Sequence, residues 1–450
     1  MFDIEGNVRE WKDHVRARGG VSEADLDELE AHLRDELAAL AGAGLAPDEA
    51  FLVAVKRLGT ADPLSGEFAK VNADHLWKQL LLVPEDPAAR GKRRREIALV
   101  VLLAVVAGVL AKIPELFGIR VGGGRELWYA RNLSFFVLPS VVVFLAWKRS
   151  LAPVFPAVLG AALVLPFALT LLFPYADPRH TELLAALHLP IVLWLLVCVV
   201  YAGARWKTTE GRMDFVRFSG EALIYSVLIG CGGAVLVAFT VAIFSSIGMD
   251  ATRITSEYVA VMGGCAIPVV AVFLVEAKRS IVENLAPVLA RIFSPLFLAV
   301  VLVFVIVMPV TGRLPFADRE FLIAFDVMLA LVLGLVLYVI SAHRDTDKPT
   351  VFDYLNLALI VVTLVADGVA LAAIIGRLST FGVTPNKLAA LGENVALLVN
   401  LGGLAVLYTR YLSGKASFKA LVSWQTAYLP VYAVWAAFVA LGFPPIFAFR

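Results

Sequence analysis

Charged side chains are scarce in this sequence. Asp, Glu, Lys and Arg make up 17% of the 450 residues, whereas 60% are hydrophobic and the mean hydropathy is +0.82. A soluble domain carries roughly 25% charged residues, because its surface must be hydrated. The deficit excludes an ordinary soluble protein and predicts that most of the surface faces lipid.

Cysteine is also rare, and the common enzyme motifs are missing. The three cysteines, Cys198, Cys231 and Cys265, lie in apolar runs, and their spacing fits neither a metal site nor a disulfide framework. The glycines at 122–124 lack the Lys and Ser/Thr that complete a phosphate-binding loop, and no zinc-protease or nucleophile-elbow motif is present. The sequence therefore predicts no enzymatic activity, no metal and no cofactor.

The N-terminal region lacks an apolar signal peptide and is acidic. Met1 to Glu10 has no hydrophobic core of the kind that secretory signals carry. Residues 1–72 contain fifteen Asp or Glu and eight Lys or Arg, a net charge of −7, so the remainder carries +8. Nucleic-acid binding needs clustered Lys and Arg to neutralise phosphates. We expect residues 1–72 to lie in the cytosol and to bind no nucleic acid.

Short amphipathic helices account for the hydrophobic pattern of residues 1–72. Helical spacing of apolar residues predicts helices over 2–18, 23–41 and 47–58, and a shorter one over 62–71. The glycines that separate them are typical helix stops, and Pro47 suits a first helical position. Three or four such helices would enclose one small hydrophobic core.

The stretch 27–71 resembles the permease prefix domain, a helical adaptor module. In that family the domain precedes membrane permease subunits or accompanies transcriptional regulators. The resemblance implies that residues 1–72 bind a cytosolic regulator or a permease partner and perform no chemistry. It rests on Glu28-Leu29, His32-Leu33, Glu36, Gly44-Leu45, Glu49-Ala50-Phe51, Leu58-Gly59 and Phe68.

Residues 73–96 form a joint that ends in a basic cluster. The segment 74–83 mixes Trp77 and leucines with polar residues, which suits either an interfacial helix or a helix packed on the N-terminal domain. Cations next to an apolar span mark its cytoplasmic end and attract anionic lipid headgroups. The cluster consists of Arg90, Lys92, Arg93, Arg94 and Arg95.

Residues 97–450 predict an all-α bundle of about eleven membrane spans. A span needs about twenty apolar residues, and the fifth segment is long enough that it must either tilt or break at 230–233. If the first span leaves the cytoplasm, the C-terminus lies outside the cell. The segments are 97–117, 132–147, 152–173, 183–204, 219–248, 258–277, 286–310, 320–342, 353–376, 389–410 and 426–443.

The turns between these spans alternate in charge. Those predicted to face the cytoplasm are all basic, as in an inner-membrane (plasma-membrane) protein that obeys the positive-inside rule. The loop after the first span is the exception, since it carries Arg120, Arg125 and Arg131. This loop and the short span 132–147 are the least determined part of the topology.

The membrane region resembles a widespread bacterial integral-membrane family defined as a domain of unknown function, DUF4153. The stretches 215–250 and 373–412 carry the resemblance, which extends over about 97–445. It implies the same multi-span fold and brings no known reaction or substrate. The late family motif corresponds to Arg377, Leu378, Phe381, Gly382, Val383, Thr384, Pro385, Asn386 and Lys387.

Ionisable residues within spans are the candidate functional residues, because charge at membrane depth is unfavourable without a role or a partner. Asp367 lies deepest, and Asp326 lies about 9 Å from the outer end of its predicted span. The alternative is that each pairs with an Arg or an amide inside the bundle. The further candidates are Glu221, Arg291 and Arg377, followed by Glu276, Glu393 and Asn400.

Two functions fit these features. The first is a membrane sensor whose cytosolic helical domain reports the state of the bundle to a partner. The second is an ion-coupled secondary transporter or permease component that uses Asp367 and Asp326. The bilayer is the one partner that composition implies directly, and neither substrate nor oligomeric state follows from the sequence.

Overall fold

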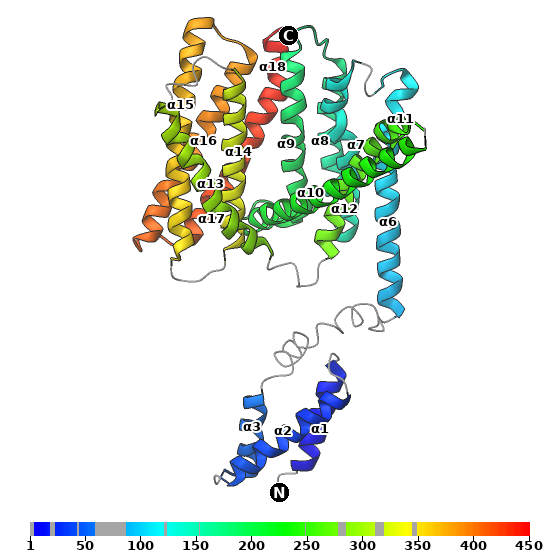
Figure 1. Cartoon of the computed structure of the whole chain (residues 1–450), viewed down its shortest axis with the longest axis vertical. Helices are drawn as coiled ribbons and strands as arrows, with labels where there is room; N and C mark the ends of the chain where they lie inside the picture. The colour runs from blue at the N-terminus through cyan, green and yellow to red at the C-terminus, as the bar shows by residue number, and fades with distance from the viewer. Residues whose placement is uncertain are drawn as a thin grey trace. The chain divides into compact units, whose positions relative to one another are not determined.

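The computed structural model is helical throughout the part of the chain that it describes, with no β-strand there (Figure 1). This confirms the predicted all-α class. The chain divides into two compact units, Met1–Arg94 and Arg95–Arg450. The described residues are 4–18, 23–42, 45–58, 87–120, 124–152, 154–247, 249–277, 285–310, 319–343 and 349–450.

The first unit contains α1 (Ile4–Arg18), α2 (Glu23–Gly42) and α3 (Pro47–Leu58). Apolar residues at helical spacing bring one face of each helix into a common core, as the sequence predicts. The fourth expected helix at 62–71 and the segment 74–83 lie outside the described residues. The core consists of Val8, Leu33, Leu37, Leu40, Ala50 and Ala54.

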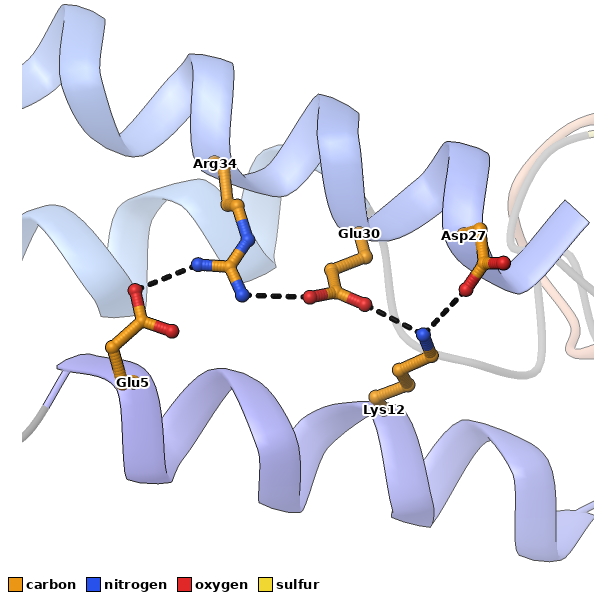
Figure 2. A network of polar contacts seen from close by, with 5 residues as sticks. All are labelled: Glu5, Lys12, Asp27, Glu30 and Arg34. Carbon is orange, nitrogen blue, oxygen red and sulfur yellow. Dashed lines mark hydrogen bonds and ion pairs between the residues drawn. The ribbon is translucent and has the colours of Figure 1, made fainter.

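A chain of ion pairs joins α1 to α2 along one side of this core (Figure 2). Lys12 contacts Asp27 and Glu30 at 2.5 and 2.6 Å, and Arg34 contacts Glu30 and Glu5 at 2.7 Å each. Hydrogen bonds from Lys12 and then Arg34 hold the pKa of Glu30 below its usual value. The two helices thus share alternating charges as well as apolar contacts.

The second unit is a bundle of long helices with short connections. Several contain an internal proline, which removes an intrahelical hydrogen bond, as membrane helices tolerate. Its helices are α6 (Pro87–Lys112), α7 (Glu126–Lys148), α8 (Val154–Leu172), α9 (His180–Ala202), α10 (Thr209–Ser246), α11 (Thr252–Ile254), α12 (Val261–Ala277), α13 (Leu285–Val310), α14 (Arg319–Ala342), α15 (Val351–Phe381), α16 (Pro385–Leu412), α17 (Phe418–Ala437) and α18 (Phe443–Ile446).

Eight helices among the described residues are long and apolar enough to cross a membrane. Three shorter apolar helices, Ala157–Leu172, Ile292–Val307 and Asp326–Ser341, coincide with the three remaining predicted segments. The chain is therefore a multi-pass membrane protein in contact with the bilayer. The exact number of eleven spans stays a prediction.

The helix α10 is unbroken, which decides between the two alternatives for the fifth segment. Its 38 residues rise about 57 Å, far more than the roughly 30 Å of a hydrocarbon core. Figure 1 shows α10 lying obliquely to α9 and α14. Residues 230–233 are helical, so the predicted break there is wrong, and tilting of the helix in the bilayer stays a prediction.

The described part of the second unit contains two large hydrophobic cores and a small third cluster of Leu184, Ala389, Val439 and Phe443. The first core joins α6 to α9 with parts of α10 and α12, around Phe144 and Leu189. The second joins α13 to α17, around Leu329 and Leu401. The helix α10 connects the two groups, where Arg217 donates to the Ser341 carbonyl at 2.9 Å. We refer to the second group as the C-terminal bundle.

Candidate functional site

Asp367 lies in the middle of the C-terminal bundle. Its side chain is completely buried, and between Val351 and Asp367 the helix α15 rises about 24 Å. Neither carboxylate oxygen has a hydrogen-bond partner among the described residues. An ionised carboxylate without a partner is strongly unfavourable away from water. Asp367 is thus poised to hold a proton or a cation.

Asp326 lies at the same depth on the neighbouring helix α14, about 24 Å before its last residue Ala342. The side-chain amide of Asn394 on α16 donates to Asp326 at 3.0 Å. The Asn394 amide oxygen is buried and without a partner in the described part of the chain. The two aspartates are close enough to interact electrostatically. The fold therefore brings together the two acidic residues that the sequence ranks first.

The pair His188–Glu393 adjoins these aspartates and links the two hydrophobic cores. His188 Nδ1 donates to the Leu184 carbonyl at 2.8 Å, which leaves Nε2 facing a Glu393 carboxylate oxygen at 2.5 Å. One proton between those atoms gives either an imidazolium and a carboxylate or two neutral groups. Glu393 also interacts electrostatically with Asp326. The pair can pass a proton between α9 and α16.

A buried amide and aromatic network lies on the other side of Asp367. Asn400 donates to Gln425 at 3.1 Å and to the Tyr432 hydroxyl at 2.6 Å, and accepts from Trp424 at 2.8 Å. Tyr432 interacts electrostatically with Asp367. These contacts fix α16 against α17 and place the Tyr432 hydroxyl near the aspartate.

We call the group formed by His188, Glu393, Asn394, Asp326 and Asp367 the acidic tier. Three consecutive helices of the C-terminal bundle contribute four of its five members, and the fifth, His188, comes from α9, which is distant in sequence. A proton can move along such a set when its members lie within reach of one another or of bridging water. The described residues contain no group of three or more His, Cys, Asp or Glu arranged to hold a metal ion.

The other predicted candidates lie elsewhere. Glu221 on α10 interacts with Tyr225 and Tyr338, near the other end of α14. Arg377 is half-buried near the end of α15, where its carbonyl accepts a 3.4 Å hydrogen bond from Lys387. Arg291 lies on α13, and its side chain is outside the described residues. The structure thus does not bring Glu221 and Arg377 into the acidic tier.

The basic cluster begins the first long helix of the second unit. Lys92, Arg93, Arg94 and Arg95 are exposed on α6, while the side chain of Arg90 is outside the described residues. The next residue, Glu96, is buried and pairs with Lys148 at the end of α7. Exposed cations at this position suit contact with lipid headgroups, which stays a prediction.

Arg131, the exception to the charge rule, is an interior residue. It is 3% exposed, donates to Glu182 at 2.8 Å, and lies over the Tyr175 ring at 4.5 Å. Because it is paired inside the protein, it does not bear on the charge of the loop. Glu276, another weaker candidate, pairs in the same way with Arg149 at 2.6 Å.

Thr384 and Pro385, in the stretch that resembles the DUF4153 motif, begin the helix α16. The Thr384 side chain accepts from the Lys387 amide at 3.4 Å, and Pro385 is the first residue of α16. Thr at the N-cap followed by Pro is a favoured way to begin a helix. The motif therefore positions the re-entry of the chain into the bundle.

Sequence reasoning missed His188 and Asn394 as functional residues. His188 was overlooked because a single histidine in an apolar run carries no spacing signal, and its partner Glu393 is distant in sequence. Asn394 follows Glu393 directly, so a polar pair within a span was the available signal. Only the packing of α9 and α14 on α16 shows which residues meet.

No family model, no curated protein and no solved structure matches this chain. The resemblances to the permease prefix domain and to DUF4153 therefore stay predictions. What can be said of function rests on the geometry of the acidic tier and of the N-terminal helices.

Proposed function

We propose that the protein is a proton-coupled membrane transporter in which Asp367 binds and releases the coupling proton. The observation that carries this proposal is the complete burial of Asp367 with both carboxylate oxygens lacking a partner among the described residues. Protonation removes the charge that burial makes unfavourable. Uptake or release of one proton therefore changes the relative stability of two conformations of the bundle, one in which Asp367 is buried and one in which it is hydrated. That change is what coupling requires.

The neighbours of Asp367 supply a route to one side of the membrane. A proton reaches the tier at His188–Glu393 and continues through Asp326, which Asn394 orients. In the orientation that the positive-inside pattern predicts, this end of the bundle faces the extracytoplasmic side of a plasma membrane. Asp367 interacts with Asp326, and Asp326 in turn with Glu393, so the three carboxyl groups form one electrostatically coupled set.

The variant Asp367→Asn tests the proposal. We expect it to lower proton flux into proteoliposomes by at least about tenfold, because the amide cannot take up a proton. Flux is measured with a trapped pH dye after an acid pulse, with the membrane potential clamped. The control is Asp250→Asn, an exposed carboxylate in the loop after α10. Wild-type flux in Asp367→Asn would reject the proposal.

A second function, signalling through the N-terminal helices, has a separate observation in its favour. Residues 4–58 have their own core and their own ion-pair network, and belong to a compact unit separate from the bundle. A module of this kind can bind a cytosolic regulator or permease subunit while the bundle works. The exposed acidic side chains of α2 would favour a basic partner.

Deletion of residues 1–72 tests this second function. We expect the truncated protein to keep its proton flux and its elution as a folded particle, and to lose at least about 90% of any protein that co-purifies with the full chain, because the partner-binding surface is gone. The measurement is quantitative mass spectrometry of crosslinked complexes. The same partners on both chains would exclude the adaptor role.

A further inference from the structure

A second set of buried polar side chains lies at the opposite end of the C-terminal bundle. Asp353 and Asn356 on α15 are 2% and 1% exposed, and Tyr408 on α16 is completely buried. Tyr408 lies close enough to Asp353 and Asn356 to interact with both. His343 Nδ1 is 3.9 Å from Asp353. We call Asp353, Asn356, Tyr408 and His343 the basal tier.

The basal tier has unused hydrogen-bonding capacity. The Tyr408 hydroxyl and the Asn356 amide oxygen are buried, and although the two residues interact, neither atom makes a hydrogen bond of good geometry among the described residues. One oxygen of Asp353 caps α15 by accepting from the backbone and side chain of Thr350 at 2.7 and 2.8 Å. Its other oxygen faces His343. The tier therefore contains a hydroxyl donor, an amide acceptor, a carboxyl group and an imidazole.

An apolar layer separates the basal tier from the acidic tier. On α16, Leu404 lies about 6 Å above Tyr408, and Leu401 lies between Leu404 and Asn400. On α15, Ile360 lies about 6 Å above Asn356 and about 10 Å below Asp367. The layer consists of Leu401, Leu404, Ile360 and Val332 of α14, all of which are completely buried in one core. A layer of this kind excludes water and blocks proton movement.

We propose that the basal tier is a second proton-binding site, and that the apolar layer around Leu404 is the closed gate between it and Asp367. The proposal rests on the proposed function of Asp367, since it supplies the other half of the proton's route. Opening the layer lets water connect Asp367 to the Tyr408 hydroxyl, which relays the proton to Asp353. His343 then shares it at the end of the bundle that carries the basic turns.

The titratable groups around the two tiers agree with this route. In the acidic tier, Asp367 interacts with Asp326 of α14 and Tyr432 of α17, and Asp326 interacts with Glu393 of α16, which His188 of α9 contacts. In the basal tier, His343 lies near Asp353, and Tyr411 of α16 interacts with Tyr408. Both ends of the layer thus present ionisable groups, whereas the layer between them is mostly aliphatic, and the hydroxyl of its buried Thr363 is bonded to the Leu359 carbonyl of the same helix.

The variant Leu404→Asn tests the gate by a gain of function. We expect proton flux into full-length protein in proteoliposomes to rise at least about tenfold, because a polar side chain lets water enter the layer. The control is Leu193→Asn on α9, an equally buried leucine in the first core. If Leu404→Asn does not elute as a folded particle, Leu404→Ala replaces it.

Double variants decide whether the leak follows the proposed route. The increase should disappear in Leu404→Asn/Tyr408→Phe, where only a hydroxyl is lost, and persist in Leu404→Asn/Tyr338→Phe. Tyr338 is a half-buried tyrosine of α14 that lies over Gly220 of α10. A folded Leu404→Asn without a leak, or a leak that survives Tyr408→Phe, overturns the proposal. Neither result affects the Asp367→Asn test, so the two proposals fail separately.

Discussion

Replacing Arg131 with Met is expected to destabilise the protein by about 3 kcal/mol, because it leaves Glu182 buried without its main partner. Glu182 is 4% exposed, and Arg131 donates to it at 2.8 Å. The alternative cation, Arg179, approaches Glu182 at only 4.0 Å and is itself exposed. It can offset part of the lost interaction, which places the effect at the lower end of the range for a broken buried pair.

The measurement is thermal unfolding of the purified protein in detergent, followed by intrinsic tryptophan fluorescence. Arg131→Met/Glu182→Leu should recover most of the lost stability, since the uncompensated charge is gone. Arg125→Met, an exposed cation just before α7, is the control and should change little. If the single and double variants unfold together, the pair contributes through packing and the electrostatic explanation is wrong.

The neighbouring glycines Gly402 and Gly403 should respond oppositely to alanine. A Cβ on Gly403 would lie 2.2 Å from Cζ2 of the Trp424 ring, whereas a Cβ on Gly402 would have no atom within 4 Å. Gly403→Ala should therefore destabilise the protein by about 1–3 kcal/mol through overpacking. Gly402→Ala should be neutral or stabilising by up to about 1 kcal/mol, because alanine favours the helix.

The same thermal unfolding assay measures both glycine variants, and Gly402→Ala on the same helix serves as the control for Gly403→Ala. Trp424→Phe in the Gly403→Ala background should restore part of the stability, because the smaller ring withdraws from the new methyl group. It also removes the hydrogen bond from Trp424 to Asn400. The recovery should therefore be partial. Equal effects of alanine at both glycines would contradict the close approach of α17 to α16.

Much of the architecture follows from the sequence because hydrophobic periodicity and length are local properties. The runs that end near Phe117, Lys148 and Ala277 are long enough to be helices whatever surrounds them. Helix starts such as Thr384-Pro385 are equally local, since the capping side chain contacts an amide three residues away. These features required no knowledge of the fold.

The sequence predicts only part of the candidate site. Asp367 and Asp326 stand out because a carboxylate in an apolar run is unfavourable wherever the helix packs. The sequence could not show that they share one site, or that Glu221 does not join them. That depends on the rotation of α10 and α14 about their axes, which is set by packing against several helices together.

The sequence by itself determined that this is a helical, multi-pass membrane protein with an acidic helical domain before its first span, and that Asp367 is its most unusual residue. The tertiary structure alone decided what surrounds that residue. It placed His188 of α9 against Glu393 of α16, and buried Leu404 between the acidic and basal tiers. Contacts between helices far apart in sequence depend on the simultaneous packing of many side chains, which no local pattern encodes.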